Sequence, residues 1–325
     1  MKVCFYIVDT YEDVEKSKLR HKVPEDWEYI TNKQTLEYTK RWGFDIKIIN
    51  NDDPICKTIN KYYDKYVRND EIDNMIAFPQ RSLDDGVYHK ETLKKAVRWI
   101  RFLESDYDIG VFFDQDILIM DQSRNFLEEI NNKCLYLKTD YVWHDDGPSD
   151  YCGKDKIPAQ WNWFSMMLAN DINRSQKSQF LIPSTGFMIG NKQNIGQILN
   201  FVELSGFQFW REEGFKNMQE YIIEIHKNRP IRTSLPSYYF HLINDEEILL
   251  HVLNKYVLDS NIVNSHPSLC SDFDISLDSL QMALNTHARM TGYLDFIKST
   301  KPIFWHLIGE ERKGWIKYLG EYYEK

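Results

Sequence analysis

The chain has 325 residues, of which 42% are hydrophobic, enough for one large α/β domain or two smaller ones. Its formal net charge is −9 and no block of Lys and Arg forms a stripe, which argues against a nucleic-acid groove. No run approaches the roughly 20 apolar residues of a transmembrane segment, and the five cysteines form neither a CxxC pair nor a zinc pattern, so we expect a cytoplasmic protein with reduced thiols.

The first part of the chain alternates between strand and helix patterns. Asp9, Thr10 and Tyr11 follow the first apolar run, at the expected carboxyl end of a strand. The strand–helix–strand order predicts a βαβ unit and therefore a parallel sheet. The predicted elements are a strand over 2–8, a helix over 31–42, a strand over 44–49, a helix over 59–67 and a helix over about 89–104.

The stretch from Val111 to Met120 is apolar except for Asp114 and Asp116. A buried strand does not tolerate an unpaired carboxylate, so we expect the strand to end at Phe113 with both carboxylates at its carboxyl edge. Ligands of open α/β sheets bind at that edge, and paired carboxylates suit Mg²⁺ or Mn²⁺ shared with substrate phosphates. The alternative is a turn in which Asp caps the next segment.

The helix over 89–104 carries cations away from its apolar face, namely Lys94, Lys95, Arg98 and Arg101. Such a row is typical of a solvated helix face. The functional alternative is that one of these cations reaches a pyrophosphate at the edge of the sheet.

The second part of the chain continues the mixed pattern without repeats or a flexible linker, which favours one domain. Asp140 follows a predicted strand, His144 lies beside two Asp in a predicted loop that could be polar or metal-binding, and Gly186 permits close approach of the backbone to a ligand. The predicted elements are a short helix over 126–130, a strand over 134–137, a loop over 141–153, a strand within 180–190, and helices over 195–204, 218–226 and 315–323.

Asp245 and Glu246 open another predicted helix. Acidic residues in a first turn interact favourably with the helix dipole, and that interpretation predicts that they are exposed. The functional interpretation predicts that they point into a cleft.

These pieces, in this order, resemble the GT-A glycosyltransferases. Within them the chain is most similar to the retaining, glycosyltransferase family 8-like group that includes glycogenin and the bacterial lipooligosaccharide galactosyltransferases. The resemblance rests on Asp114-x-Asp116 and on His306-x-x-Gly309, with a cation and Trp315 following. It implies a Rossmann-like single domain with a mostly parallel central sheet flanked by helices. Residues 1–120 would form the nucleotide-binding half and residues 121–325 the acceptor-side half, with a C-terminal metal and phosphate segment.

The resemblance also implies roles for individual residues. Asp114, Asp116 and His306 would hold Mn²⁺ or Mg²⁺, and imidazole suits Mn²⁺ better. Asp140 would bind donor-sugar hydroxyls, and Asp245-Glu246 would lie beside the anomeric carbon. The nucleotide-sugar donor, a UDP-sugar by resemblance, would contact Asp9, Thr10, Tyr11, Asp114, Gly309, either Arg312 or Lys313, and one of Lys94, Lys95 or Arg98.

The implied reaction moves a sugar to an acceptor hydroxyl with retention, and the acceptor, whether glycan, protein or small molecule, is left open. An inverting enzyme would need a carboxylate base, for which Glu246 or Glu247 could serve. A nucleotidyltransferase or pyrophosphorylase is a second class, although no Gly-rich phosphate loop supports it. A third class is a non-catalytic sugar- or protein-binding module, whose many Trp and Tyr could stack on sugars.

Overall fold

The computed structural model describes residues 1–10, 26–69, 90–115, 117–144, 147–148, 181–228, 245, 274–276 and 303–306. All structural statements below refer to these residues. In this part of the chain, no helix combines the length and the apolar character needed to cross a membrane.

The described elements alternate between strands and helices along most of the chain. The strands are β1 (Val3–Asp9), β2 (Asp45–Asn50), β3 (Ile109–Phe113), β4 (Ile117–Ile119), β5 (Cys134–His144), β6 (Gly147–Pro148), β7 (Leu181–Asn191), β8 (Asp274–Ser276) and β9 (Phe304–His306). The helices are α1 (Asp26–Trp42), α2 (Pro54–Tyr62), a π-helix (Tyr63–Val67), α5 (Val97–Leu103), a 3₁₀ turn (Phe126–Glu128), α7 (Lys192–Leu204) and α8 (Glu212–Asn228). Residues 90–95 are also helical and lead into α5.

The strands form a mixed central sheet in the order β2-β1-β3-β7-β5-β6, with β8 beside β5. β1 runs parallel to both β2 and β3, which confirms the predicted βαβ unit and the α/β class. β7 runs antiparallel to both of its neighbours, β3 and β5. The sheet is therefore parallel over β2, β1 and β3 and changes direction at β7. This reversal brings Phe187 opposite Phe113, next to the end of β3.

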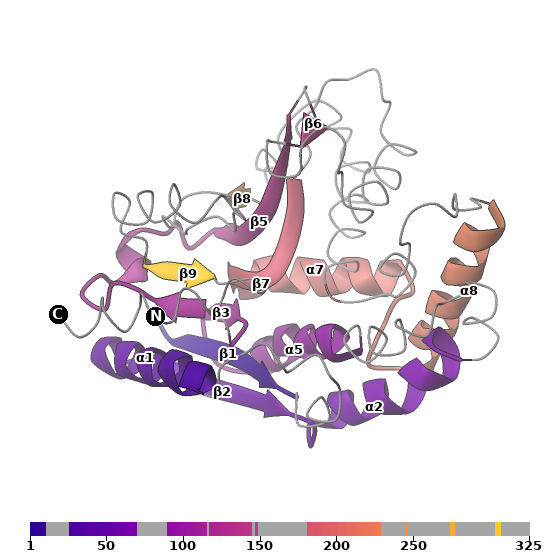
Figure 1. Cartoon of the computed structure of the whole chain (residues 1–325), viewed down its shortest axis with the longest axis horizontal. Coiled ribbons are helices and arrows are strands. Elements are labelled where there is room, and N and C mark those ends of the chain that lie inside the picture. Colours follow the sequence, from indigo (N-terminus) through magenta and orange to yellow (C-terminus); the bar gives the residue numbers. More distant parts are fainter. Residues whose placement is uncertain are drawn as a thin grey trace.

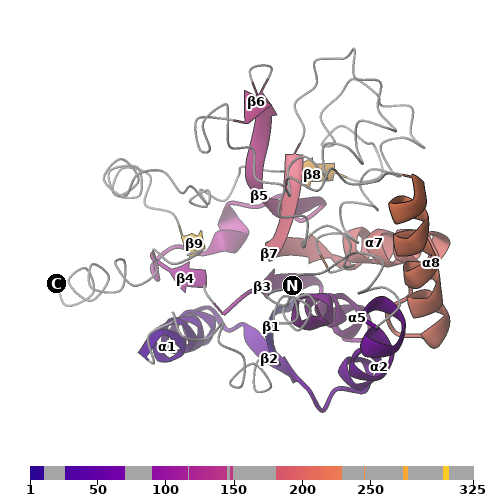
Figure 2. The same ribbon diagram turned by 45° about the vertical axis from the view of Figure 1, so that its right-hand side comes forward.

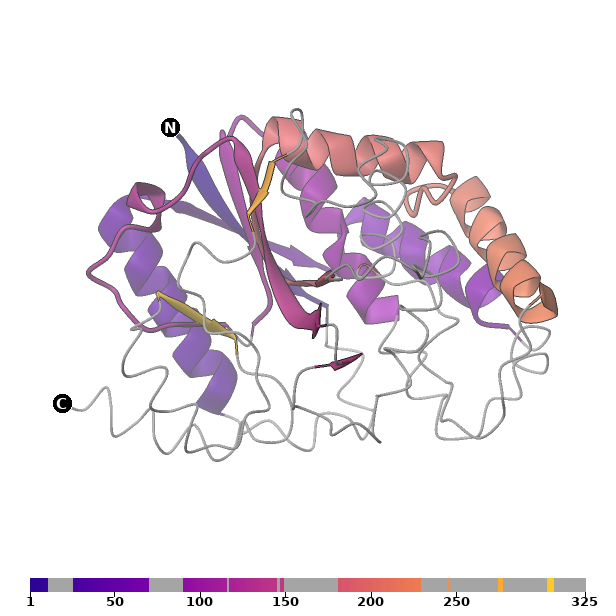
Figure 3. The ribbon, with the colours of Figure 1, turned by 90° about the horizontal axis from the view of Figure 1, so that it is seen from above.

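Helices cover both faces of the sheet, with α1 on one face and α2, α5, α7 and α8 on the other (Figures 1 and 3). Alternate side chains of β1 enter two separate cores. Phe5 packs on the α1 side with Tyr38, whereas Tyr6 packs on the α5 side with Phe102. A strand buried on both faces has a continuous apolar sequence, which is why residues 3–8 show no alternation.

α2 begins at Pro54, earlier than the predicted start at residue 59. The side chain of Asp53 accepts a hydrogen bond of 2.8 Å from the amide of Ile55, and Pro54 occupies the first turn. Both features favour a helix start because they satisfy or remove the backbone donors that lack partners there. The C-terminal part of the predicted helix forms the π-helix instead.

β5 is longer than predicted, because the first residues of the expected loop over 141–153 pair with β7. Tyr141 lies opposite Ile182 and Val142 opposite Leu181. Asp140 therefore lies within the strand and not after its end. It falls at an irregularity between Thr139 and Tyr141, where the pairing register shifts. Such bulges redirect a strand and occur often beside active sites.

The close packing around Gly110 gives a test of the β3 core. A Cβ added at Gly110 would come within 2.4 Å of Phe112 Cζ and 3.1 Å of Phe102 Cδ2. We expect Gly110→Ala to lower the free energy of unfolding by about 1–3 kcal/mol, because one of the rings must leave its position. Denaturant unfolding measures this change.

Gly196 in α7 is the matched control, since a Cβ added there meets nothing within 4 Å. Gly196→Ala should raise the free energy of unfolding by about 0.5–1 kcal/mol through helix propensity. Equal effects of the two substitutions would contradict the packing at β3.

Candidate functional site

Asp114 lies directly after β3, where the sequence predicted that the strand ends. Its amide donates a 2.9 Å hydrogen bond to the carbonyl of Gly186 in β7. Its side chain is 16% exposed, so the carboxylate lies at the edge of the sheet and needs partners there.

Two cations from the helical segment supply those partners. Lys95 Nζ donates to Asp114 Oδ2, and Arg98 Nη1 donates to Asp114 Oδ1 at 3.3 Å. The Arg98 side chain is fully buried, and its Nη2 donates to the carbonyl of Thr185 at 3.0 Å. The sequence pattern had suggested that these cations form a solvated helix face. That prediction is wrong for Lys95 and Arg98, which pair with Asp114 at the edge of the sheet.

Asp245 joins the same cluster from a distant part of the sequence. It is completely buried, and its Oδ2 accepts a hydrogen bond from Thr185 Oγ1. No described residue donates a hydrogen bond to its Oδ1. Burial raises the pKa of Asp245 above its usual value, and so does the charge of Asp114, whereas Lys95, Thr185 and Arg98 oppose the rise. The interpretation that predicted an exposed Asp245 is wrong, because this carboxylate packs beside the end of β3.

Lys94 points away from Asp114, toward the ends of β1 and β2. Its buried ammonium donates to Glu91 Oε1 at 2.6 Å and to Asn51 Oδ1 at 2.7 Å. Asn51 in turn donates to the carbonyl of Thr10 at 3.1 Å. In the described part of the chain, Thr10 Oγ1 and Glu91 Oε2 are buried without a hydrogen-bond partner. Asp9, the last residue of β1, is exposed beside this polar cluster.

The small β4–β9 sheet brings the backbone of His306 beside the Asp-x-Asp turn. The two strands are antiparallel, with His306 opposite Ile117, the residue that follows Asp116. β9 also packs against α1, since the ring centroids of Phe304 and Tyr38 lie 5.9 Å apart, and Figure 2 shows β4 and β9 above α1. Carboxylates with an imidazole are a donor set that fits Mn²⁺. The described residues contain no cluster of three or more His, Cys, Asp or Glu able to hold a metal ion.

Several predicted site residues lie outside the described part of the chain, namely Tyr11, Asp116, Glu246, Gly309, Arg312 and Lys313. For Asp140, His144 and His306 the structure describes the strand but not the side chain. The residues that it does bring together are Asp114, Asp245, Lys95 and Arg98, with Lys94 and Thr10 in the neighbouring polar cluster.

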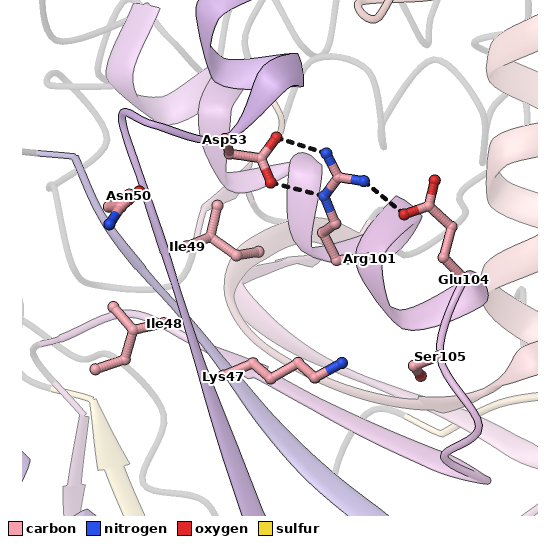
Figure 4. Close-up of a pocket in the computed structure, with 8 residues that line it drawn as sticks. All are labelled: Lys47, Ile48, Ile49, Asn50, Asp53, Arg101, Glu104 and Ser105. Atoms are coloured by element: carbon pink, nitrogen blue, oxygen red, sulfur yellow. Dashed lines mark hydrogen bonds and ion pairs between the residues drawn. The ribbon is translucent and has the colours of Figure 1, made fainter.

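A pocket of about 530 Å³ lies apart from both clusters, between β2 and the end of α5 (Figure 4). Three of its charged side chains pair with one another, because Arg101 donates to both oxygens of Asp53 at 2.6 and 2.8 Å and to Glu104 at 2.5 Å. This arrangement ties α5 to the start of α2. Of the helix cations named from the sequence, Arg101 lines this pocket, where its partners are Asp53 and Glu104.

Three contacts of the candidate site were not predicted from the sequence. Glu91 lies three residues before Lys94, and that helical spacing is a signal for a pair. Asn51 and the hydroxyl of Thr185 carry no such local signal, because their partners come from other elements.

No protein-family model and no curated protein sequence matches the chain. Two solved structures are similar over nearly the whole length. A glycosyltransferase involved in the glycosylation of the major capsid of PBCV-1 is 7% identical, with a TM-score of 0.35, over 95% of this chain and 96% of the other. Mouse xyloside xylosyltransferase 1 in its apo form is 10% identical, with a TM-score of 0.37, over 94% and 97%. At these values neither match assigns the chain to a family.

Substitution of Lys94 tests whether the buried Lys94–Glu91 ion pair of the polar cluster forms. Both side chains are almost completely buried. Lys94→Met should lower the free energy of unfolding by about 3–5 kcal/mol, because it leaves the Glu91 carboxylate buried without its counter-charge. Chemical denaturation of the two proteins measures this.

Lys90→Met provides the control from the same helical segment. Lys90 pairs with Asp64 at 3.0 Å, with exposures of 18% and 58%, so its loss should cost less than about 1 kcal/mol. A similarly small cost for Lys94→Met would mean that the buried pair does not form.

Proposed function

We propose that this chain is a metal-dependent glycosyltransferase that moves a sugar from a nucleotide-sugar to an acceptor hydroxyl. The observation that carries the proposal is the convergence of Asp114, Asp245, Lys95 and Arg98 at the carboxyl end of β3. In open α/β sheets this edge is where ligands bind. The carboxylates suit a metal and the developing charge on a sugar, and the cations suit a diphosphate.

The metal in this proposal is Mn²⁺ or Mg²⁺, held by Asp114, Asp116 and His306. The backbone register of β4 and β9 supports the choice of His306, since it lies opposite Ile117. A bound divalent cation supplies Lewis-acid stabilisation of the diphosphate leaving group.

The protein's own charged groups would do the remaining work. Lys95 and Arg98, at the end of β3, would add positive charge near the leaving group, and so would either Arg312 or Lys313. As the glycosidic bond breaks, positive charge develops on the sugar. Asp245, Asp140 and Glu246 are the carboxylates proposed to stabilise that charge, and we propose retention of configuration.

The proposed donor is a UDP-sugar whose base and ribose lie at the ends of β1 and β2. Asp9, Thr10 and Tyr11 are the proposed contacts. Two observations support this position: Asp9 is exposed, and the buried hydroxyl of Thr10 has no partner among the described residues. Lys94 would act here through Asn51, which holds the carbonyl of Thr10.

A cytoplasmic location is part of the proposal. Cys4 and Cys56 are buried as free thiols in the described part of the chain, which suits a reducing compartment.

A screen of nucleotide-sugars for hydrolysis tests the proposal without knowledge of the acceptor. We expect slow release of nucleotide from a UDP-sugar in the presence of Mn²⁺, and none after chelation of the metal. Chromatography of the released nucleotide measures the rate. Absence of hydrolysis across uridine, guanosine, adenosine and cytidine donors would contradict the proposed function.

Asp116→Ala should abolish that hydrolysis and change the free energy of unfolding by no more than about 1 kcal/mol, since the effect is on a ligand site and not on a core residue. Asp52→Ala is the control, because Asp52 is 88% exposed in a surface pair with Lys57. Full turnover by Asp116→Ala would remove Asp116 from the site.

A further inference from the structure

Lys95 lies close to both carboxylates of the candidate site, the partly buried Asp114 and the buried Asp245. Its ammonium donates to Asp114 Oδ2, and the side chain is 12% exposed. It also acts on Asp245. Burial raises the pKa of Asp245, and the positive charge of Lys95 is the strongest of the effects that oppose this rise. One ammonium is thus within electrostatic reach of two carboxylates.

Arg98 is held by several fixed hydrogen bonds. Its guanidinium is fully buried and donates to the carbonyl of Thr185 at 3.0 Å and to that of Lys95 at 2.8 Å, besides its contact with Asp114. A planar, rigid group with several fixed bonds does not change partner easily. The lysine has a flexible chain with a compact, rotatable ammonium, and it is the partly exposed member of the pair.

Asp245 offers a second position for that ammonium. One oxygen accepts from Thr185, but no described residue donates to the other, although the residue is completely buried. A buried carboxylate oxygen without a donor is unfavourable, and an arriving cation would relieve it.

We propose that Lys95 is the built-in counter-ion of the metal site, which pairs with Asp114 in the metal-free protein and moves to Asp245 when a divalent cation binds Asp114. This inference rests on the proposed function, because it assumes that Asp114 is a metal ligand. An ammonium on Asp114 Oδ2 repels a divalent cation that binds the same carboxylate, and Lys95, unlike the fixed Arg98, can move away. Lys95 is therefore a positioning residue that couples metal binding to the charge state around Asp245.

The experiment is a calorimetric titration of the full chain with Mn²⁺ alone, without nucleotide. Lys95→Met should bind Mn²⁺ about tenfold more tightly than the unsubstituted protein, a typical size for coupling between two binding events. Lys95→Arg, which keeps the charge, should retain the weaker affinity. Lys90→Met, from the same helical segment but paired with Asp64, should leave the affinity unchanged.

A double-mutant cycle tests the second position of the ammonium. Asp245→Asn should weaken Mn²⁺ binding, because the displaced Lys95 then lacks its carboxylate, and should weaken it several-fold less in the Lys95→Met background. Additive effects would overturn the move to Asp245.

The possible outcomes distinguish a failure of the Lys95 proposal from a failure of the proposed metal site. Equal Mn²⁺ affinity of Lys95→Met and the unsubstituted protein would overturn the inference and leave the metal site in place. Absence of Mn²⁺ binding in both proteins would overturn the metal site and the inference together.

Discussion

The candidate site depends on the hydrogen bonds of the buried Arg98 guanidinium. It joins the carboxylate of Asp114, after β3, to the carbonyl of Thr185, in β7. A charge buried this deeply must keep its partners, since loss of one partner of such a pair costs about 3–5 kcal/mol. The antiparallel pairing of β3 with β7 adds the bond from the Asp114 amide to Gly186. Arg98 and this pairing together fix the position of Asp114, and the hydroxyl of Thr185 then fixes Asp245.

The helical segment before β3 supplies positive charge at two separate sites along the edge of the sheet. Lys94 serves the ends of β1 and β2 through Glu91 and Asn51, whereas Lys95 serves the end of β3. Neighbouring residues of a helix point in different directions, so one short segment can supply both places. In a chain with a net charge of −9, these cations give a diphosphate a local positive environment that the protein as a whole lacks.

Local sequence patterns predicted the parts of the fold that depend on local physics. The apolar run over 3–8 predicted the buried strand β1. The end of β3 before Asp114 could be predicted because burial excludes an unpaired carboxylate. The reversal of direction at β7 and the length of β5 could not, because they arise from pairing between distant strands. For the same reason the sequence could not choose among Lys94, Lys95 and Arg98, since their different partners lie on other elements. The family resemblance named Asp245, and the sequence held no signal for its contact with Thr185.

The site assembled around Asp114 is most directly tested by titrating the full chain with UDP in the presence and absence of Mn²⁺. UDP should bind only when Mn²⁺ is present, because Lys95 and Arg98 already pair with Asp114 and the metal supplies the further positive charge that the diphosphate needs. Isothermal calorimetry should therefore show metal-dependent binding of UDP. Equal binding with and without Mn²⁺, or no binding in either case, would contradict a metal-dependent nucleotide-sugar site at the end of β3.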